Sequence, residues 1–401
     1  MLSRRSVYCS KYPNGKYSIV RFDNAEGNIR FKKIKHVWKG EKCAFCGASK
    51  AEYERDDTLE AHAYEFIHTN KPKEMFNMKF DVIISNPPYQ LSDGGGMGTS
   101  AMPLYHKFVE QAKKLKPRYL SMIIPARWYA GGKGLDEFRS TMLSDNHIRV
   151  LADFFNATDC FPGVDISGGV CYFLWERDDG GKCDVISIRG DNQSNMKRHL
   201  LEQSSNTFIR FNEAIGIYRK IRHENETSFS DGVSPRRPFG ISATVEMSEN
   251  EKSGTIKMFA YPKSGFISTN SIERNRDWVD KYKVFLAKAY GERGDFPYLV
   301  TGKPFIGEPK TCSSETYLVA RVCENRQEAE NIISYMTTKL FRFLVLLKKN
   351  TQNTSKDVYS FVPVQDFSQS WTDEKLYKKY NLTEEEIAFI ESMIRPMELN
   401  D

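Results

Sequence analysis

The sequence predicts an α/β protein, with a mainly parallel sheet and an antiparallel edge pair, followed by a loop-rich α+β region. Two observations lead to this fold class. Between Phe80 and Trp175, runs of β-branched and aromatic residues alternate with amphipathic segments, as they do in parallel sheets. Beyond Asn206 the chain changes to short apolar pieces interrupted by glycine, proline and arginine, which is typical of irregular structure.

The elements of the first region follow one another along the chain. Strands are expected at FDVII, YLSMII (Tyr119–Ile124), IRVLADF and VCYFLW, because each is a short apolar run rich in β-branched or aromatic residues. Helices are expected at LDEFRSTML and at PLYHKFVEQAKKL, which places Leu104, Phe108 and Ala112 on one face. The last two strands lie close together, across the turn-rich CFPGVDISGG, which predicts that they pair antiparallel.

These patterns divide the chain into four parts. An N-terminal segment covers 1–75, the alternating core covers 76–190, a polar transition covers 191–230, and a second domain covers 231–401. In the second domain, AENIISYMTTKLFRFLVLL predicts one amphipathic helix, and TEEEIAFIESMIRP predicts a helix capped by Thr383.

Composition excludes several classes of protein. The chain has 401 residues, 40% of them hydrophobic and 27% charged, as in soluble globular proteins. No apolar run approaches the ~18 residues of a membrane span, and the start of the chain lacks the apolar segment of a secretory signal. The 8 cysteines are scattered and do not form a disulfide framework, so we expect a cytoplasmic protein without membrane contact. A net charge of +6 mildly favours polyanionic partners.

The strand FDVII runs directly into Asn86, Pro87, Pro88 and Tyr89. Two consecutive prolines remove two backbone donors and fix two φ angles, so the loop is rigid. Loops at the carboxyl ends of strands are also where open α/β sheets bind ligands. The Asn86 amide oxygen and the Pro87 carbonyl are therefore candidates to accept the two N–H bonds of a planar amine such as N6 of adenine. Tyr89 offers a ring face on which the base can stack.

Such an arrangement suits transfer chemistry at an exocyclic nitrogen. Accepting both hydrogens out of the ring plane favours a tetrahedral nitrogen with an exposed lone pair, and interactions that arise in the transition state raise the rate. A base inside a duplex has to flip out to reach such a loop. The alternative is that the motif is only a rigid turn and that Tyr89 is a packing residue.

The motif after FDVII resembles that of the adenine-N6-specific DNA methyltransferases, which carry Asp, Asn or Ser before Pro-Pro and an aromatic residue. PLYHKFVEQAKKLKPRYLSMIIPARW, FPGVDISGGVCYFLW and TQNTSKDVYSFVP are similar to segments of the type II restriction-modification methylases, and the resemblance extends from Val7 to Pro396. It implies a Rossmann-like methyltransferase core at 76–190 and a target-recognition domain at 231–401. It also implies methyl transfer from S-adenosylmethionine to adenine in double-stranded DNA, and a cognate restriction endonuclease.

The family places a glycine-rich cofactor loop after its first strand, upstream of the motif, and an acidic ribose ligand after the next strand. YPNGKYSIVRFDNAEGNIRF contains no such loop, and neither Ser167–Gly169 nor VTGKPFIG replaces it. The cofactor-binding residues therefore stay unassigned. The resemblance then implies an enzyme that is N-terminally truncated, decayed, or split, with another chain supplying the cofactor loop. The alternative is a non-catalytic DNA-binding module; a nuclease is disfavoured because no D…E-x-K arrangement is evident.

The N-terminal segment carries a candidate zinc site. Cys43-x2-Cys46 is followed after fifteen residues by His62-x5-His68, which is within the spacing of tetrahedral zinc sites. A bound zinc ion would brace this segment ahead of the catalytic strand. The alternatives are inert buried cysteines, a redox pair, and histidines that are packed or exposed without a metal.

The stretch PRRPFG is a candidate DNA-reading surface. Arg236 and Arg237 are expected to contact phosphates or guanine edges. The resemblance makes Phe239 a candidate for a second aromatic wall around the flipped base. The alternative is that the arginines are solvated loop charges and that Phe239 is a core residue. The basic loop KKNTQNTSK either contacts the DNA backbone or caps the preceding helix.

Overall fold

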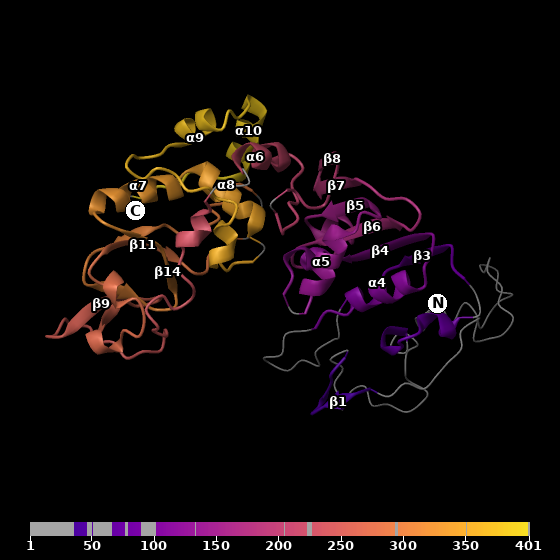
Figure 1. The fold of residues 1–401 in the computed structure, drawn as a ribbon, viewed down its shortest axis with the longest axis horizontal. Coiled ribbons are helices and arrows are strands. Elements are labelled where there is room, and N and C mark those ends of the chain that lie inside the picture. The colour runs from indigo at the N-terminus through magenta and orange to yellow at the C-terminus, as the bar shows by residue number, and fades with distance from the viewer. Residues whose placement is uncertain are drawn as a thin grey trace. The chain divides into compact units, whose positions relative to one another are not determined.

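The computed structural model describes residues 36–45, 50, 66–76, 79–89, 102–132, 134–203, 205–222, 227–292, 296–349 and 351–399. The chain forms two compact units, Met1–Glu202 and Gln203–Asp401, and each has its own sheets (Figure 1). Among the described residues, no helix has the length and apolar character needed to cross a membrane.

The first unit is built on a six-stranded sheet with the order β3-β4-β6-β5-β7-β8. Its strands are β3 (Val82–Ser85), β4 (Tyr119–Pro125), β5 (Ile148–Phe154), β6 (Val170–Glu176), β7 (Cys183–Arg189) and β8 (Asn192–Arg198). β3, β4, β5 and β7 run in one direction, whereas β6 and β8 run in the other. The predicted α/β class with a mainly parallel sheet is confirmed.

The antiparallel pairs differ in place from the sequence expectation. β5 and β6 pair antiparallel as predicted, but they lie inside the sheet, and the antiparallel pair at the edge is β7 with β8. The sequence analysis did not find β7, and it assigned β8 to the polar transition over 191–230. β8 is polar because it is an edge strand and most of its side chains are exposed or only partly buried.

Helices cover one face of this sheet. α4 (Tyr105–Lys114) and α5 (Asp136–Ser144) lie on the same side of the strands (Figure 1). Alternate residues of β4, from Leu120 to Ile124, are buried on one face. On the opposite face, Val82 (51% exposed), Ile84 (79%) and Tyr172 (38%) are open to solvent. An apolar surface is thus exposed where a doubly wound sheet carries a second helical layer.

The N-terminal segment packs against α4. It contains the short strands β1 (Trp38–Lys39) and β2 (Lys42–Cys43), a helical turn at 66–68, and the 3₁₀ helix η1 (Pro72–Met75). One buried cluster joins the two parts and consists of Cys43, Phe66, Ile67, Met75, Leu104 and Phe108.

The second unit has two three-stranded sheets, with the orders β10-β9-β13 and β12-β11-β14. Their strands are β9 (Thr255–Phe259), β10 (Gly265–Ser268), β11 (Tyr282–Ala287), β12 (Phe305–Gly307), β13 (Thr311–Ser313) and β14 (Tyr317–Cys323). Its helices are α6 (Ala214–Ile221), α7 (Arg326–Met336), α8 (Lys339–Lys348), α9 (Asp373–Lys379) and α10 (Glu384–Met393). The remaining 3₁₀ helices are η2 (Ala126–Ala130) and η3 (Ala157–Asp159) in the first unit, and η4 (Phe229–Gly232), η5 (Thr269–Ser271), η6 (Arg276–Trp278) and η7 (Lys356–Tyr359) in the second.

Two features of the second unit test the sequence expectations. The single helix predicted for AENIISYMTTKLFRFLVLL is two helices, α7 and α8. They are separate because the Thr338 hydroxyl accepts the N–H of Phe341 and caps a new helix. The predicted cap of the last helix is confirmed, since Thr383 and Glu386 form a capping box.

Candidate active site

The Asn-Pro-Pro-Tyr motif lies at the carboxyl end of β3, the strand that forms one edge of the sheet. Asn86 and Pro88 are exposed, Pro87 is buried, and Tyr89 is partly buried. Among the described residues, no group donates a hydrogen bond to the Asn86 side chain or to the Pro87 carbonyl. Within the described ranges, the two acceptors proposed from the sequence therefore have no hydrogen-bond partner.

The Tyr89 backbone is bonded to the start of α4, and its side chain ends in a buried hydroxyl. Its carbonyl accepts the N–H of Leu104 at 3.0 Å, which ties the motif to the residue preceding α4. Its hydroxyl is buried, and within the described part of the chain it has no hydrogen-bond partner. Burial raises the pKa of Tyr89 to about 12, and Cys160 and Cys171 add to the shift. A buried hydroxyl left unpaired costs ~1–3 kcal/mol, which is a cost that functional sites carry.

Tyr105, at the start of α4, contributes a second unpaired hydroxyl. It is 2% exposed, its hydroxyl has no hydrogen-bond partner within the described ranges, and burial raises its pKa. Cys171 adds to that shift, as it does for Tyr89. Sequence reasoning missed Tyr105; an aromatic residue at the first turn of the helix after the motif was the available signal.

The carboxyl ends of β4 and β5 meet the loop 161–169 next to this site. The N–H of Ala126 donates to the Gly169 carbonyl at 3.0 Å. Gly169 has a φ of +82°, and a Cβ there would lie 2.0 Å from the Phe154 carbonyl oxygen, so the close approach needs glycine. The Trp128 indole is buried and donates to Cys171 Sγ at 3.4 Å, whereas Arg127 beside it is exposed. Arg127 places a cation at the carboxyl end of β4, and the sequence analysis did not identify it.

The described residues do not provide a site for S-adenosylmethionine. No described strand lies beyond β3, and none of the described loops at the carboxyl edge of the sheet is the glycine-rich turn between strand and helix that the cofactor requires. The apolar side chains of Val82 and Ile84 are exposed on β3, the edge strand. The described residues therefore do not fit the group that would donate the methyl.

The predicted zinc ligands are only partly described. Cys43 and His68 come together as predicted, whereas Cys46 and His62 lie outside the described residues. The third member of the cluster is His36, which the sequence analysis missed. It precedes Cys43 by seven positions, so the Cys-x2-Cys spacing did not draw attention to it.

The structure places the candidate DNA-binding residues of the second unit in two different settings. Arg236 and Arg237 are exposed, and both contact the Glu315 carboxylate, at 2.6 and 3.0 Å. Phe239 is fully buried in a hydrophobic cluster with Met258 and other residues. The expectation that Phe239 forms a wall of the base pocket is wrong, because its ring is enclosed by the core and has no free face.

The basic loop after α8 is also used internally. Lys348 is buried, and its ammonium donates to Asn206 Oδ1 at 2.7 Å. The Lys349 ammonium donates to the carbonyls of Tyr290 and Val300 at 2.6 and 2.5 Å, and burial lowers the pKa of Lys349 to about 8. These contacts leave neither lysine directed at a DNA backbone.

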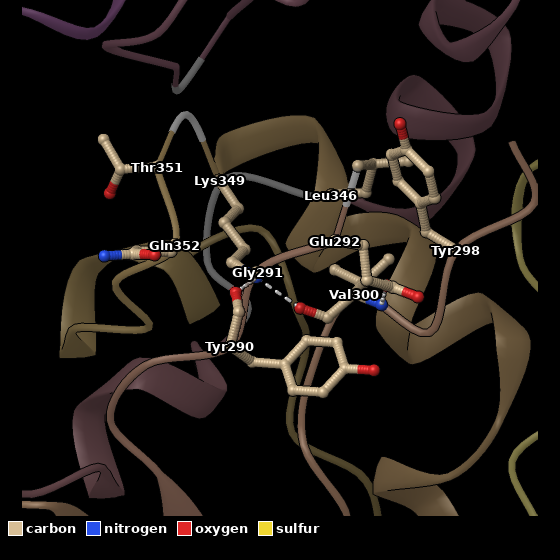
Figure 2. Close-up of a pocket in the computed structure, with 9 residues that line it drawn as sticks. All are labelled: Tyr290, Gly291, Glu292, Tyr298, Val300, Leu346, Lys349, Thr351 and Gln352. Carbon is tan, nitrogen blue, oxygen red and sulfur yellow. Dashed lines mark hydrogen bonds between the residues drawn. The ribbon is translucent and has the colours of Figure 1, made fainter. Parts of the chain in front are cut away.

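Figure 2 shows the pocket of about 390 Å³ that Lys349 lines together with Tyr290, Glu292 and Tyr298. In this view the Lys349 side chain reaches toward the backbone of the opposite segment and does not project into open space. The pocket is therefore walled by residues that hold the loops of the second unit together.

Comparison with known proteins gives these sites a context. Residues 1–161 match the family model described as Eco57I restriction-modification methylase. An uncharacterized adenine-specific methylase of Mycoplasma pneumoniae is 38% identical over 205 residues, which cover 45% of this chain and 49% of the relative. The chain thus matches about half the length of that curated relative.

Two solved structures are similar at a greater distance. The type IIG restriction endonuclease BpuSI has 12% identity and a TM-score of 0.33, over 79% of this chain and 50% of that protein. The type IIL restriction-modification enzyme MmeI, solved in complex with DNA, has 7% identity and a TM-score of 0.38, over 70% of this chain and 45% of that one. The family match includes the Asn-Pro-Pro-Tyr motif and confirms, over residues 1–161, the resemblance stated from the sequence.

Proposed function

Since residues 1–161 carry an Eco57I restriction-modification methylase domain, we propose that this protein takes part in the methylation of adenine N6 in a recognised sequence of double-stranded DNA. The observation that carries the proposal is the position and exposure of the Asn-Pro-Pro-Tyr motif. The exposed Asn86 amide and the partly buried Tyr89 ring stand together at the carboxyl edge of the sheet. The curated relative, which is named an adenine-specific methylase, supports adenine as the target base.

Asn86 and Pro87 supply the acceptors for the reaction. The Asn86 side-chain oxygen and the Pro87 carbonyl accept the two N6 hydrogens, and the prolines keep the carbonyl from turning away. As the nitrogen becomes tetrahedral, its N–H bonds point more directly at these oxygens, so the contacts strengthen in the transition state and raise the rate. The methyl group comes from S-adenosylmethionine, which the described residues alone do not hold.

Tyr89 receives the base once it leaves the duplex. Flipping a nucleotide costs a few kcal/mol, and stacking on an aromatic ring returns roughly 1–3 kcal/mol per base. The ring is held in place, since its own carbonyl is bonded to Leu104 N–H and its hydroxyl end is buried. A ring held in this way loses little conformational entropy when a base stacks on it.

A specific observation favours a second form of this function, a half-enzyme that needs further polypeptide. β3 forms the edge of the sheet, and Val82 and Ile84 expose 51% and 79% of their surface beside the motif. In the methyltransferases that the sequence resembles, strands and a glycine-rich loop hold S-adenosylmethionine, and we infer that these elements would fit against this edge. We assign them to polypeptide outside the described residues, supplied either by this protein or by a partner chain. A restriction endonuclease that cleaves the same DNA sequence completes the system.

Two measurements test the proposal on the full-length chain. Calorimetric titration with S-adenosylmethionine shows whether the chain binds the donor, and transfer of a labelled methyl group to duplexes of mixed sequence shows whether it reacts. We expect Asn86→Ala to reduce labelling by about 10²–10³-fold, as the loss of one transition-state acceptor does. Asn192→Ala removes an exposed amide from the start of β8 and is expected to leave labelling unchanged.

The outcomes separate the two forms. Labelling by the isolated chain supports a complete enzyme. Absence of both donor binding and labelling, with activity restored by a polypeptide that carries the glycine-rich loop, supports the half-enzyme. Equal labelling by the Asn86→Ala variant and the unchanged protein would remove the motif from the chemistry and contradict both forms.

A further inference from the structure

Three side chains that commonly bind metals meet in the N-terminal segment. His36 precedes β1, Cys43 ends β2, and His68 lies in the helical turn at 66–68. One ligand atom from each lies within 4.8 Å of those from the other two. We propose that His36, Cys43 and His68 bind a structural zinc ion that braces the N-terminal segment against α4. This inference goes beyond the proposed methylation and does not depend on it.

The donor atoms select the metal. Two imidazole nitrogens and one thiolate sulfur suit zinc, whereas calcium and magnesium prefer oxygen ligands. Around a tetrahedral zinc ion, with bonds of ~2.0–2.3 Å, neighbouring ligand atoms stand about 3.3–3.6 Å apart. The limit of 4.8 Å is wider than this, so binding requires side-chain rotations that draw the three ligand atoms together. Tetrahedral coordination leaves a fourth position for a water molecule or for a ligand outside the described residues.

The burial of the cluster supports a bound ion. Cys43 is 3% exposed and His36 is 9% exposed. His68 Nε2 is buried, and no group in the described part of the chain bonds to it. An unpaired buried nitrogen costs ~1–3 kcal/mol, and coordination of a metal removes that cost. Cys43 is not in a disulfide.

One positively charged side chain, that of Lys107, acts on His68. Its ammonium lies 3.6 Å from the centroid of the Phe45 ring, which holds it by a cation–π contact.

A continuous set of contacts leads from this cluster to the proposed active site. Gln111 of α4 donates to the carbonyls of Phe66 and Thr69, each at 2.6 Å, and thereby holds the chain on both sides of His68. At the start of the same helix, Leu104 N–H donates to the Tyr89 carbonyl at 3.0 Å. An ion at His68 therefore fixes the helix on which the position of Tyr89 depends.

Metal content and cobalt spectroscopy test the proposal on the full-length chain. Protein produced in zinc-containing medium is dialysed against a weak chelator, and its zinc is measured by mass spectrometry. Chelator-stripped protein is then titrated with Co²⁺, which absorbs visibly when tetrahedral and gives a separate charge-transfer band when bound by a thiolate. We expect a stoichiometric zinc ion per chain and both cobalt features.

Variants assign the ligands. His36→Asn and Cys43→Ser are expected to weaken zinc binding by at least about ten-fold, and Cys43→Ser also removes the thiolate band. The matched control is His199→Asn, which changes an exposed histidine of the same unit. Circular dichroism identifies any variant that has unfolded. If a variant does unfold, the cobalt spectrum of the unchanged protein still tests the proposal. The proposal is overturned if the unchanged protein holds no zinc and shows no thiolate band, or if His36→Asn binds zinc as tightly as His199→Asn.

Discussion

The buried cations of the second unit and the buried tyrosines beside the Asn-Pro-Pro-Tyr motif differ in their hydrogen bonding. In the second unit, the buried Lys283 ammonium donates to three backbone carbonyls, and the buried Arg342 guanidinium donates to four. In the first unit, the buried hydroxyls of Tyr89 and Tyr105 have no partner among the described residues. Buried hydroxyls without a partner among the described residues also occur in the second unit, at Ser313 and Tyr359. Each such group costs ~1–3 kcal/mol, so the pair at Tyr89 and Tyr105 is of interest because it adjoins the Asn-Pro-Pro-Tyr motif.

This difference also changes how basic residues in the sequence are interpreted. Lys348, the last residue of α8, and Lys349 begin a basic stretch whose composition suggests DNA contact. Both ammonium groups are nevertheless bonded within the second unit. Arg236 and Arg237 are exposed, but they share one carboxylate, that of Glu315. A run of basic residues in the sequence therefore does not by itself indicate a phosphate-binding surface, because the side chains can instead form hydrogen bonds and ion pairs within the protein.

The largest expected effect contrasts two apolar residues, one from each unit. Phe239 is fully buried, and Phe239→Ala is expected to reduce the free energy of unfolding by about 3–5 kcal/mol through the lost contacts and the cavity. Ile84 is 79% exposed, and Ile84→Ala is expected to change it by less than about 0.5 kcal/mol. Urea unfolding followed by circular dichroism measures both. A small effect of Phe239→Ala would return that residue to the list of base-contacting candidates.

The next effect concerns the cation that holds two loops of the second unit. Lys349→Met keeps the length of the side chain but leaves the carbonyls of Tyr290 and Val300 without their donor. We expect destabilisation of about 1–3 kcal/mol for each carbonyl. Lys356→Met, at an exposed position of the same loop, is the control and should be nearly neutral. If both variants unfold at the same urea concentration, the Lys349 contacts contribute nothing to stability.

A pair of tyrosines sharpens the contrast between unpaired and paired hydroxyls. Tyr335→Phe removes a buried hydroxyl that donates to the Pro363 carbonyl at 2.8 Å, and a cost of about 1–3 kcal/mol is expected. Tyr89→Phe removes a hydroxyl without a partner, so the free energy of unfolding should stay the same or rise slightly. Thermal unfolding compares the two variants. A large loss in Tyr89→Phe would mean that its hydroxyl has a stabilising partner outside the described residues.

Sequence patterns predicted those strands of the first unit that are continuous apolar runs. β3 to β6 were found because such runs indicate strands, whether they lie inside the sheet, as β4 to β6 do, or at its edge, as β3 does. β7 was not found, although alternate residues of this strand are buried. β8 was missed because NQSNMKR, an edge strand with mostly polar side chains, carries almost no such signal. The break between α7 and α8 was missed because its cause is the cap at Thr338, and a threonine pair inside an apolar pattern does not by itself end a helix.

For the candidate sites, residues that form a local sequence motif were easier to predict than the burial or the spatial neighbours of single residues. The rigid motif at Asn86–Tyr89 was identifiable because two prolines after a strand have few other uses. The core position of Phe239 was not, since an aromatic residue between Pro and Gly has the same local pattern whether it faces solvent or a core. His36 was missed for a related reason, because its approach to Cys43 and His68 depends on how distant segments pack.

The smallest expected effect tests whether the exposed arginines of the second unit read DNA. Their hydrogen bonds to Glu315, above all that of Arg237, hold the pKa of this carboxyl below its usual range, so it is ionised at neutral pH and competes with phosphate. Glu315→Gln removes that competition, and exposed ion pairs contribute only ~0–1 kcal/mol to stability. We therefore expect an unchanged fold and a several-fold gain in duplex affinity at low salt. Fluorescence anisotropy measures this gain.

The control has to separate a local effect from a general change in charge. Glu249→Gln makes the same change in charge at an exposed ion pair with Lys263, elsewhere in the second unit. If both variants gain affinity equally, the gain reflects net charge alone, and Arg236 and Arg237 lose their proposed role. A gain confined to Glu315→Gln, lost again when both arginines are changed to alanine, places the phosphate contact at these two residues, because binding that depends on ion release responds to each cation at the contact.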